Sequence, residues 1–177
     1  KGVFQVQEVK IAEGFNQKEV LAIVSLLESK STHPVAKAIA DYVGNVQDSF
    51  TLESSEEIAG HGLKGIINGK EVVAGNFRLI DKFGISYDIK LKDIPLTIVA
   101  IAIDKKFAGY ITIADEIKED AQQTIENLNK LGIETVMLSG DKTAVVNYVA
   151  TQLKMTKAYG DLLPEDKVAR VQEIKNT

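Results

Sequence analysis

A short apolar strand runs into a polar loop at Thr135-Val136-Met137-Leu138-Ser139-Gly140-Asp141. A helical segment precedes this stretch and is predicted to stop at Gly132, and a second helix is predicted over residues 144–153. Another strand at residues 158–159 and another helix over residues 165–174 follow. This alternation of helices and strands predicts a parallel sheet with crossover helices.

Upstream of this region the pattern changes to short β-like runs, which predict an antiparallel α+β block. Asn68-Gly69 indicates a tight hairpin turn between two of them. The runs are expected at residues 50–58, 63–67, 71–74, 96–104 and 107–113.

The N-terminal part begins with an alternating, strand-like segment at residues 1–10 and continues as a helical hairpin. Asn16 and Glu19 have the spacing of a capping box, and Pro34 suits the first turn of a second helix. The two strands of the C-terminal region are too few for a free-standing parallel domain. Either the N-terminal strand joins them after a long insertion, or the chain is a piece of a larger protein.

The composition excludes several classes of function. The chain has 177 residues, of which 45% are hydrophobic, and its formal net charge is −4. It therefore lacks the cationic excess that nucleic-acid binding requires. With no Cys and two His, a zinc finger and a disulfide framework are excluded, and no metal site is predicted. The longest apolar run is too short to cross a bilayer, which predicts a soluble chain without membrane contact.

Two glycine-rich segments are candidate ligand sites. Gly60-His61-Gly62-Leu63-Lys64-Gly65 has the spacing G-x-G-x-x-G, which lets backbone N–H groups approach a phosphate or a flat ring. A hairpin follows it where a dinucleotide fold would have a helix, so that fold is rejected. Gly75-Asn76 closes the next strand. The alternative for both segments is a glycine bend without a ligand.

The helical hairpin carries a second candidate site. Ser31-Thr32-His33-Pro34 places an imidazole at a helix entrance, where free backbone donors favour an anion. His33 is equally interpretable as a capping residue. Glu28 lies one turn back on the preceding helix, and the alternative for this residue is an ordinary solvated carboxylate.

The third candidate site follows the strand quoted at the start. Ser139, Gly140 and Asp141 lie where ligands of parallel sheets bind, and a hydroxyl with exposed N–H groups suits a phosphoryl group. The alternative is that Ser139 or Asp141 caps the next helix. Lys167 occupies the first turn of the last helix, where a cation opposes the helix dipole and indicates a nearby anion.

Taken together, these motifs resemble the P-type ATPases, and specifically their heavy-metal-transporting branch. The resemblance implies that Glu28 contacts the adenine amino edge and that His33, within Ser31-x-His33-Pro34, orients ATP. It further implies that Gly60 and Gly62, in the segment ending at Gly65, let the backbone reach the nucleotide. In such proteins Gly75 and Asn76 complete the pocket, and Ser139, Gly140, Asp141 and Lys167 stabilise a transferred phosphoryl group.

The resemblance also implies a domain arrangement. Residues 8–104 form a nucleotide-binding domain, an antiparallel sheet with a helical hairpin. It is inserted into a partial phosphorylation domain at residues 1–7 and 105–177, which has a haloacid-dehalogenase-like parallel α/β fold. The family's nucleophilic aspartate and magnesium-binding motif are expected outside this chain, so the fragment alone is expected to bind ATP with Mg²⁺ without turning it over.

The expected parent is an integral plasma-membrane protein whose cytoplasmic part includes this fragment. Its actuator and transmembrane domains are the expected partners. The opening Lys1-Gly2-Val3-Phe4 and the later Leu162-Leu163-Pro164-Glu165-Asp166-Lys167 look more like the zinc, cadmium and lead subgroup than the copper subgroup. Two other readings of the chain are a stand-alone haloacid-dehalogenase-type phosphatase that uses Asp141 and a non-enzymatic nucleotide-binding module.

Overall fold

The computed structural model describes residues 3–46, 49–115, 117 and 119–176, which form two compact units. The first unit contains the described residues of 3–92 and 97–115, and the second contains those of 93–96 and 117–176. One sheet is antiparallel and the other is parallel. The predicted mixed fold class is therefore confirmed.

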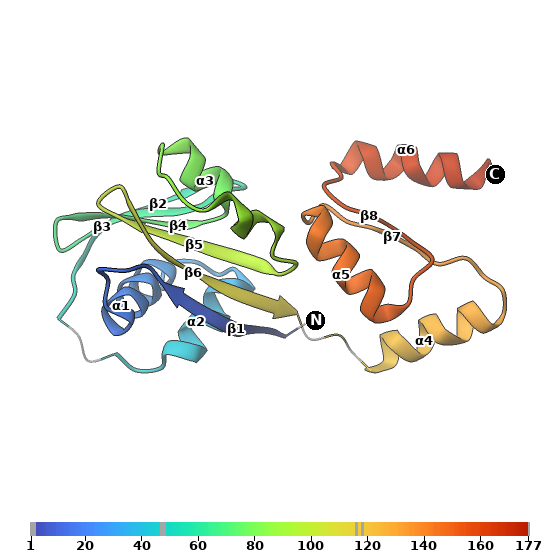
Figure 1. Ribbon diagram of the computed structural model, residues 1–177, viewed down its shortest axis with the longest axis horizontal. Helices are drawn as coiled ribbons and strands as arrows, with labels where there is room; N and C mark the ends of the chain where they lie inside the picture. Colours follow the sequence, from blue (N-terminus) through green and yellow to red (C-terminus); the bar gives the residue numbers. More distant parts are fainter. Residues whose placement is uncertain (1–2, 47–48, 116, 118, 177) are drawn as a thin grey trace. The chain divides into compact units, whose positions relative to one another are not determined.

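The first unit is built on a six-stranded antiparallel sheet with the order β1-β6-β5-β4-β3-β2 (Figure 1). Between β3 and β4, Asn68 and Gly69 have φ angles of 49° and 74°, which a two-residue turn of type I′ requires. The predicted hairpin turn is thus confirmed. The strands are β1 (Phe4–Ile11), β2 (Leu52–Ile58), β3 (Gly62–Ile67), β4 (Lys70–Gly75), β5 (Thr97–Ile103) and β6 (Lys106–Asp115).

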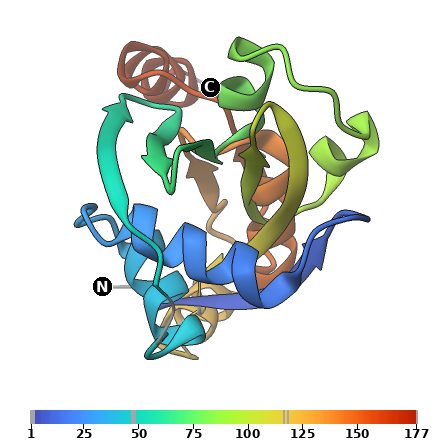
Figure 2. The same ribbon diagram turned by 90° about the vertical axis from the view of Figure 1, so that its left-hand side faces the viewer.

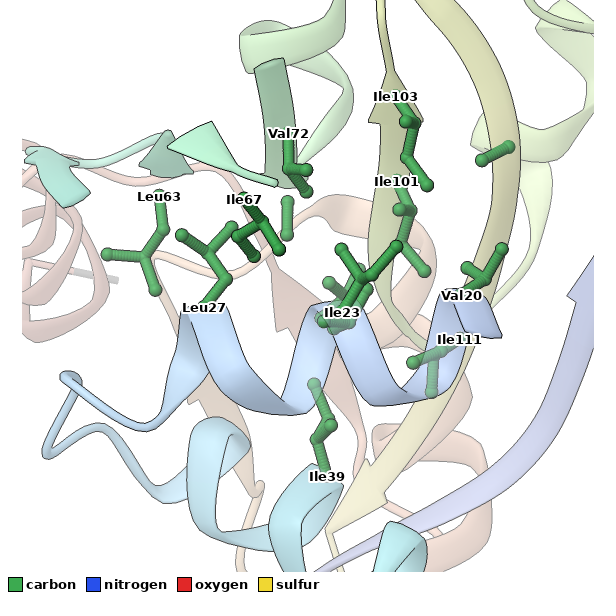
Figure 3. Close-up of a cluster of buried hydrophobic side chains, with 14 of the residues drawn as sticks. Val20, Ile23, Leu27, Ile39, Leu63, Ile67, Val72, Ile101, Ile103 and Ile111 are labelled. Carbon is green, nitrogen blue, oxygen red and sulfur yellow. The ribbon is translucent and has the colours of Figure 1, made fainter. Parts of the chain in front are cut away.

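Helices cover both faces of this sheet, with α1 (Gln17–Glu28) and α2 (Pro34–Val43) on one side and α3 (Phe77–Lys82) on the other (Figure 2). A short 3-10 helix, η1 (Ile89–Asp93), precedes β5. The Asn16 side chain accepts a hydrogen bond from the Glu19 N–H at 3.2 Å, so the predicted start of α1 is confirmed. The face of α1 that points into the sheet carries Val20, Ile23 and Leu27 (Figure 3), and Val24 belongs to the same buried cluster.

The N-terminal strand does not join the parallel C-terminal strands, which was one of the two expectations. β1 pairs with β6, with Val9 opposite Ile111 and Ile11 opposite Gly109. It therefore extends the antiparallel sheet and does not join the parallel strands. The reason is its alternating pattern, which places partly buried apolar side chains against the core of the first unit.

The compact units also divide the chain at a different place from the expected domains. Because β6 continues through Asp115 and is hydrogen-bonded on both sides, residues 105–115 lie in the first unit, as do residues 3–7. Residues 1, 2, 116, 118 and 177 lie outside the described residues. The functional division at residues 8–104 stays a prediction.

The second unit is a small parallel α/β structure. β7 (Val136–Leu138) and β8 (Lys157–Tyr159) pair in parallel, as predicted, and α5 (Thr143–Leu153) connects them. α4 (Glu119–Lys130) precedes β7, and α6 (Pro164–Lys175) follows β8. Figure 1 shows α5 and α6 on opposite sides of the strand pair. Within the part of the chain that the structure describes, no helix is both long and apolar enough to cross a membrane.

Candidate functional site

The turn between α1 and α2 is held together by side-chain hydrogen bonds between residues two positions apart. The Ser31 hydroxyl accepts from the His33 N–H, and Nδ1 of His33 accepts from the Val35 N–H, both at 3.2 Å. His33 is therefore the N-cap of α2. Because Nδ1 acts as the acceptor, the proton of the neutral ring is on Nε2. The capping and ligand interpretations are thus compatible, since the exposed imidazole keeps a second nitrogen that can donate to an anion.

Glu28, the last residue of α1, is buried, with 8% of its surface exposed. The alternative of an ordinary solvated carboxylate is therefore wrong. Burial raises the pKa of the Glu28 carboxyl to about 7, without an opposing charge or hydrogen bond among the described residues. At neutral pH this group is thus divided between a carboxylic acid and a carboxylate, which is unusual for a glutamate at a helix end.

α1 packs closely against β3 at the residue before Glu28. A Cβ added to Gly65 would lie 2.6 Å from the Ser54 carbonyl oxygen and 2.7 Å from Leu27 Cδ1. A side chain at position 65 would therefore push the last turn of α1 away from the sheet. We infer that Gly65 helps to keep Glu28 buried through its small size.

The glycine bend, residues 59–61, joins β2 to β3. A strand and not a helix follows it, which agrees with the rejection of a dinucleotide fold. Gly60 has a φ of +71°, and a Cβ built on it would meet nothing within 4 Å. Asn76 holds this bend: its Nδ2 donates to the Gly60 carbonyl at 2.9 Å, and its backbone N–H donates to the His61 carbonyl. Nδ1 of His61 lies 2.9 Å from the Ala59 carbonyl oxygen, to which it donates. The bend combines open space at Gly60 with a fixed backbone.

Gly62 and Gly75 are required by the protein's own backbone. A Cβ on Gly62 would lie 2.3 Å from the Ala74 carbonyl oxygen, and one on Gly75 would lie 2.2 Å from the His61 carbonyl oxygen. The two strands approach each other too closely for any side chain here. The glycine spacing thus has a structural cause, which the sequence interpretation based on ligand access did not include.

We expect Asn76→Ala to destabilise the first unit by about 1 to 2 kcal/mol, because Asn76 Oδ1 also caps α3 by accepting from the Leu79 N–H at 3.1 Å. Asn76→Asp is the matched variant, since it keeps the cap and loses the donor to Gly60. Urea unfolding of both variants separates the two contributions. Equal stability of Asn76→Ala and the wild type would contradict both.

In the second unit, the loop after β7 is fixed by hydrogen bonds to the loop after β8. The Ser139 N–H donates to the Tyr159 carbonyl at 3.0 Å, and the Leu162 N–H donates to the Ser139 carbonyl at 3.1 Å. The Ser139 hydroxyl accepts from the Asp141 N–H. Gly140 and Asp141 are exposed at the carboxyl end of β7. The N–H groups of Ser139 and Asp141, which the sequence interpretation expected to be exposed, are already bonded within the loops.

The cap of α5 comes from a residue that was not predicted from the sequence. Neither Ser139 nor Asp141 supplies it. Oδ2 of Asp161 accepts from both the N–H and the hydroxyl of Thr143, at 3.0 and 2.6 Å. The partners are 18 positions apart, so no local spacing could have indicated the pair, although an aspartate directly after a glycine at a strand end is a weak signal.

Two lysines lie near the ends of these loops. Lys167 is half-buried in the first turn of α6, where Asp166 accepts a hydrogen bond from the Leu163 N–H at 2.9 Å. Lys142, also half-buried, is the residue before α5. Burial lowers the pKa of Lys142, and the negative charge of Asp161 opposes this effect. Lys142 is not among the residues predicted from the sequence, although its position at a helix N-terminus is a signal for it.

The predicted site residues therefore fall into two groups. Those of the first unit lie on the α1–α2 turn and on the glycine bend, while those of the second unit lie at the loop after β7 and at the start of α6. Among the described residues, no group of three or more His, Asp or Glu side chains is arranged to hold a metal ion.

A parallel α/β unit with a polar loop after its strand and a lysine at the start of a later helix is typical of phosphoryl-handling hydrolases. A family model described as haloacid dehalogenase-like hydrolase matches residues 4–177, so the chain belongs to the haloacid dehalogenase-like hydrolase family. More particularly, the chain is 41% identical over 180 residues to the cadmium, zinc and cobalt-transporting ATPase of Bacillus subtilis (strain 168). The alignment covers 99% of this chain and 25% of that relative.

Solved structures agree with this similarity. A zinc-transporting PIB-type ATPase in the E2.Pi state has 26% sequence identity and a TM-score of 0.67, with 98% of this chain and 29% of that chain covered. The N-domain of HMA6, a copper-transporting P-type ATPase, has 28% identity and a TM-score of 0.53, covering 63% of this chain and 99% of that domain. The resemblance to heavy-metal P-type ATPases is confirmed. The chain spans about a quarter of the length of the curated relatives that it matches.

Proposed function

We propose that the first unit binds ATP and that the second holds the transferred phosphoryl group in a heavy-metal-exporting P-type ATPase, which works through an aspartyl-phosphate intermediate. Residues 8–104 would be the nucleotide-binding domain, and residues 1–7 and 105–177 would belong to the phosphorylation domain. The chain would lie on the cytoplasmic side of the membrane and work with the actuator and transmembrane domains. The similarity to a zinc-transporting and to a cadmium, zinc and cobalt-transporting ATPase supports a cargo of this group.

The observation that carries the proposal is the buried carboxyl of Glu28 beside the α1–α2 turn. Burial of most of this residue disfavours the charged form of its carboxyl, although none of the described side-chain oxygens is fully buried without a hydrogen-bond partner. A ligand with hydrogen-bond donors, such as the amino edge of adenine, would satisfy this carboxyl. His33 would donate a hydrogen bond from Nε2 to the nucleotide. The open space at Gly60 would leave room for the nucleotide.

Mg²⁺ would accompany the nucleotide. The described residues offer no cluster of ligands for a resident cation, and Mg²⁺ is commonly held through substrate phosphates. Bound with ATP, it would neutralise charge on the phosphates. The chain's own part would be to bind and orient the base and to keep the phosphates near His33.

The loop after β7 would act on the phosphoryl group itself. The backbone N–H of the exposed Gly140 and the hydroxyl proton of Ser139 would be offered to phosphate oxygens, while the N–H of Asp141 holds the Ser139 hydroxyl in place. Lys167 would supply a positive charge. Phosphoryl transfer depends mainly on positioning and on stabilising such charge, and these groups are suited to both tasks.

ATP binding to the chain is expected to be modest, with a Kd between about 1 μM and 1 mM, or about −8 to −4 kcal/mol. We expect His33→Asn to weaken it by about 1 to 3 kcal/mol, since the Nε2 donor is lost. Asn can still cap α2, so the thermal midpoint should stay close to that of the wild type. Calorimetric titration with ATP and thermal unfolding provide the two measurements.

His33→Ala is the matched control. It should lose the same ATP affinity and also about 1 kcal/mol of stability, because the cap of α2 is removed. If His33→Asn binds ATP as tightly as the wild type, His33 is only a capping residue and the proposed contact is wrong.

A further inference from the structure

The residue at the N-cap position of α5 does not cap the helix with its side chain. Lys142 occupies the N-cap position and makes no capping hydrogen bond. The cap is supplied by Asp161, whose Oδ2 accepts from the Thr143 N–H and the Thr143 hydroxyl. The carboxylate therefore ties the first turn of α5 to the loop after β8.

Backbone contacts make this connection tight. The Asp161 N–H donates to the Asp141 carbonyl at 2.7 Å. A Cβ on the neighbouring Gly160 would lie 2.6 Å from Thr143 Cα, so the two loops approach as closely as their backbones allow. Asp161 itself has a φ of +54°, a left-handed conformation that Asp and Asn tolerate better than other side chains.

We propose that Asp161 is a positioning residue of the phosphoryl site, which acts by fixing Thr143 and thereby the Ser139-Gly140-Asp141 loop. The inference rests on the proposed function, because that function makes this loop a phosphoryl site. A loop that is fixed before the ligand arrives need not be ordered on binding, which favours both affinity and rate. In this role Asp161 would act through Thr143 and the loop rather than by binding the phosphoryl group itself.

Two substitutions separate the carboxylate from the backbone conformation. Asp161→Gly keeps the left-handed φ and removes the acceptor. Asp161→Asn keeps both the φ and an oxygen that can accept from Thr143. Thr143→Val removes the hydroxyl donor alone, and Thr143→Ser is its control, since it retains the hydroxyl.

The test uses the full-length ATPase that contains this chain and measures phosphoenzyme formation from ATP, inhibition by orthovanadate and the Kd of ATP. We expect Asp161→Gly to slow phosphoenzyme formation and weaken vanadate inhibition by about tenfold to a hundredfold, as the loss of a hydrogen bond to a charged group implies. The Kd of ATP should stay unchanged. Asp161→Asn should restore both activities to within about threefold, and Thr143→Val combined with Asp161→Gly should be little worse than Asp161→Gly alone.

Normal phosphorylation and vanadate inhibition in Asp161→Gly would overturn the inference and leave the proposed function standing. Equal damage in Asp161→Asn and Asp161→Gly, with Thr143→Val unaffected, would also overturn it, because the charge and not the hydrogen bond would then matter. If Asp161→Gly does not fold, the comparison of Thr143→Val with Thr143→Ser decides. A wild-type protein that forms no phosphoenzyme would overturn the proposed function, and the inference with it.

Discussion

Gly62→Val is expected to destabilise the first unit by about 2 to 6 kcal/mol. Overpacking against the Ala74 carbonyl, which a Cβ would approach to 2.3 Å, accounts for about 1 to 3 kcal/mol. The φ of +144°, which a β-branched residue strongly disfavours, accounts for another 1 to 3 kcal/mol or so. Urea unfolding of the 177-residue chain measures the total.

Gly60→Ala is the control for this prediction. It also requires a positive φ, but its Cβ would meet nothing within 4 Å, so the expected loss is about 1 to 2 kcal/mol. A stability of Gly62→Val within 1 kcal/mol or so of Gly60→Ala would show that the strands can separate at this point. Because Gly62→Val is expected to lose much stability, its ATP binding must be measured under conditions in which the variant is still folded.

The second large effect is a dependence of stability on pH that arises from Glu28. In the folded chain the carboxyl releases its proton near pH 7, whereas its ordinary pKa is 4.5. Between these values the folded state holds more protons than the unfolded state, so stability falls as the pH rises. Glu28 therefore imposes no penalty below about pH 4.5, and a full penalty of about 3 kcal/mol above about pH 7.

Glu28→Gln, which stays neutral, removes this dependence. We expect the variant to be more stable than the wild type by about 3 kcal/mol at pH 8, and by less than 1 kcal/mol or so at pH 5. Glu13→Gln removes an exposed carboxylate from the same unit and serves as the control. Denaturant unfolding at four pH values gives the comparison, and parallel pH profiles for the wild type and Glu28→Gln would refute the assignment.

Local signals in the sequence predicted most of the secondary structure. The Asn16 cap, the Asn68-Gly69 turn and the stop at Gly132 depend on neighbouring residues alone, and each lies where its side chain or φ angle predicts. The parallel pairing of the C-terminal strands was also predictable, because helix–strand alternation leaves few other connections.

The features that could not be predicted depend on contacts between distant residues. The burial of Glu28 is not indicated by its neighbours in the sequence, and the cap of α5 comes from Asp161, 18 positions away. The unit boundary near residue 116 follows from the pairing of β1 with β6. In each case the local pattern was compatible with several partners, and only the packing selects one.

The pairing of β1 with β6 has a consequence for how the protein folds during synthesis. Across the two strands, the Thr112 hydroxyl donates to the Glu8 carbonyl over 104 positions. At about 5 to 20 residues per second, a ribosome needs roughly 5 to 20 s to make that partner. Until then the apolar side chains of the first strand have no sheet to join. Such distant pairings slow folding, and they leave the apolar face of β1 open to association with other chains until β6 has been made.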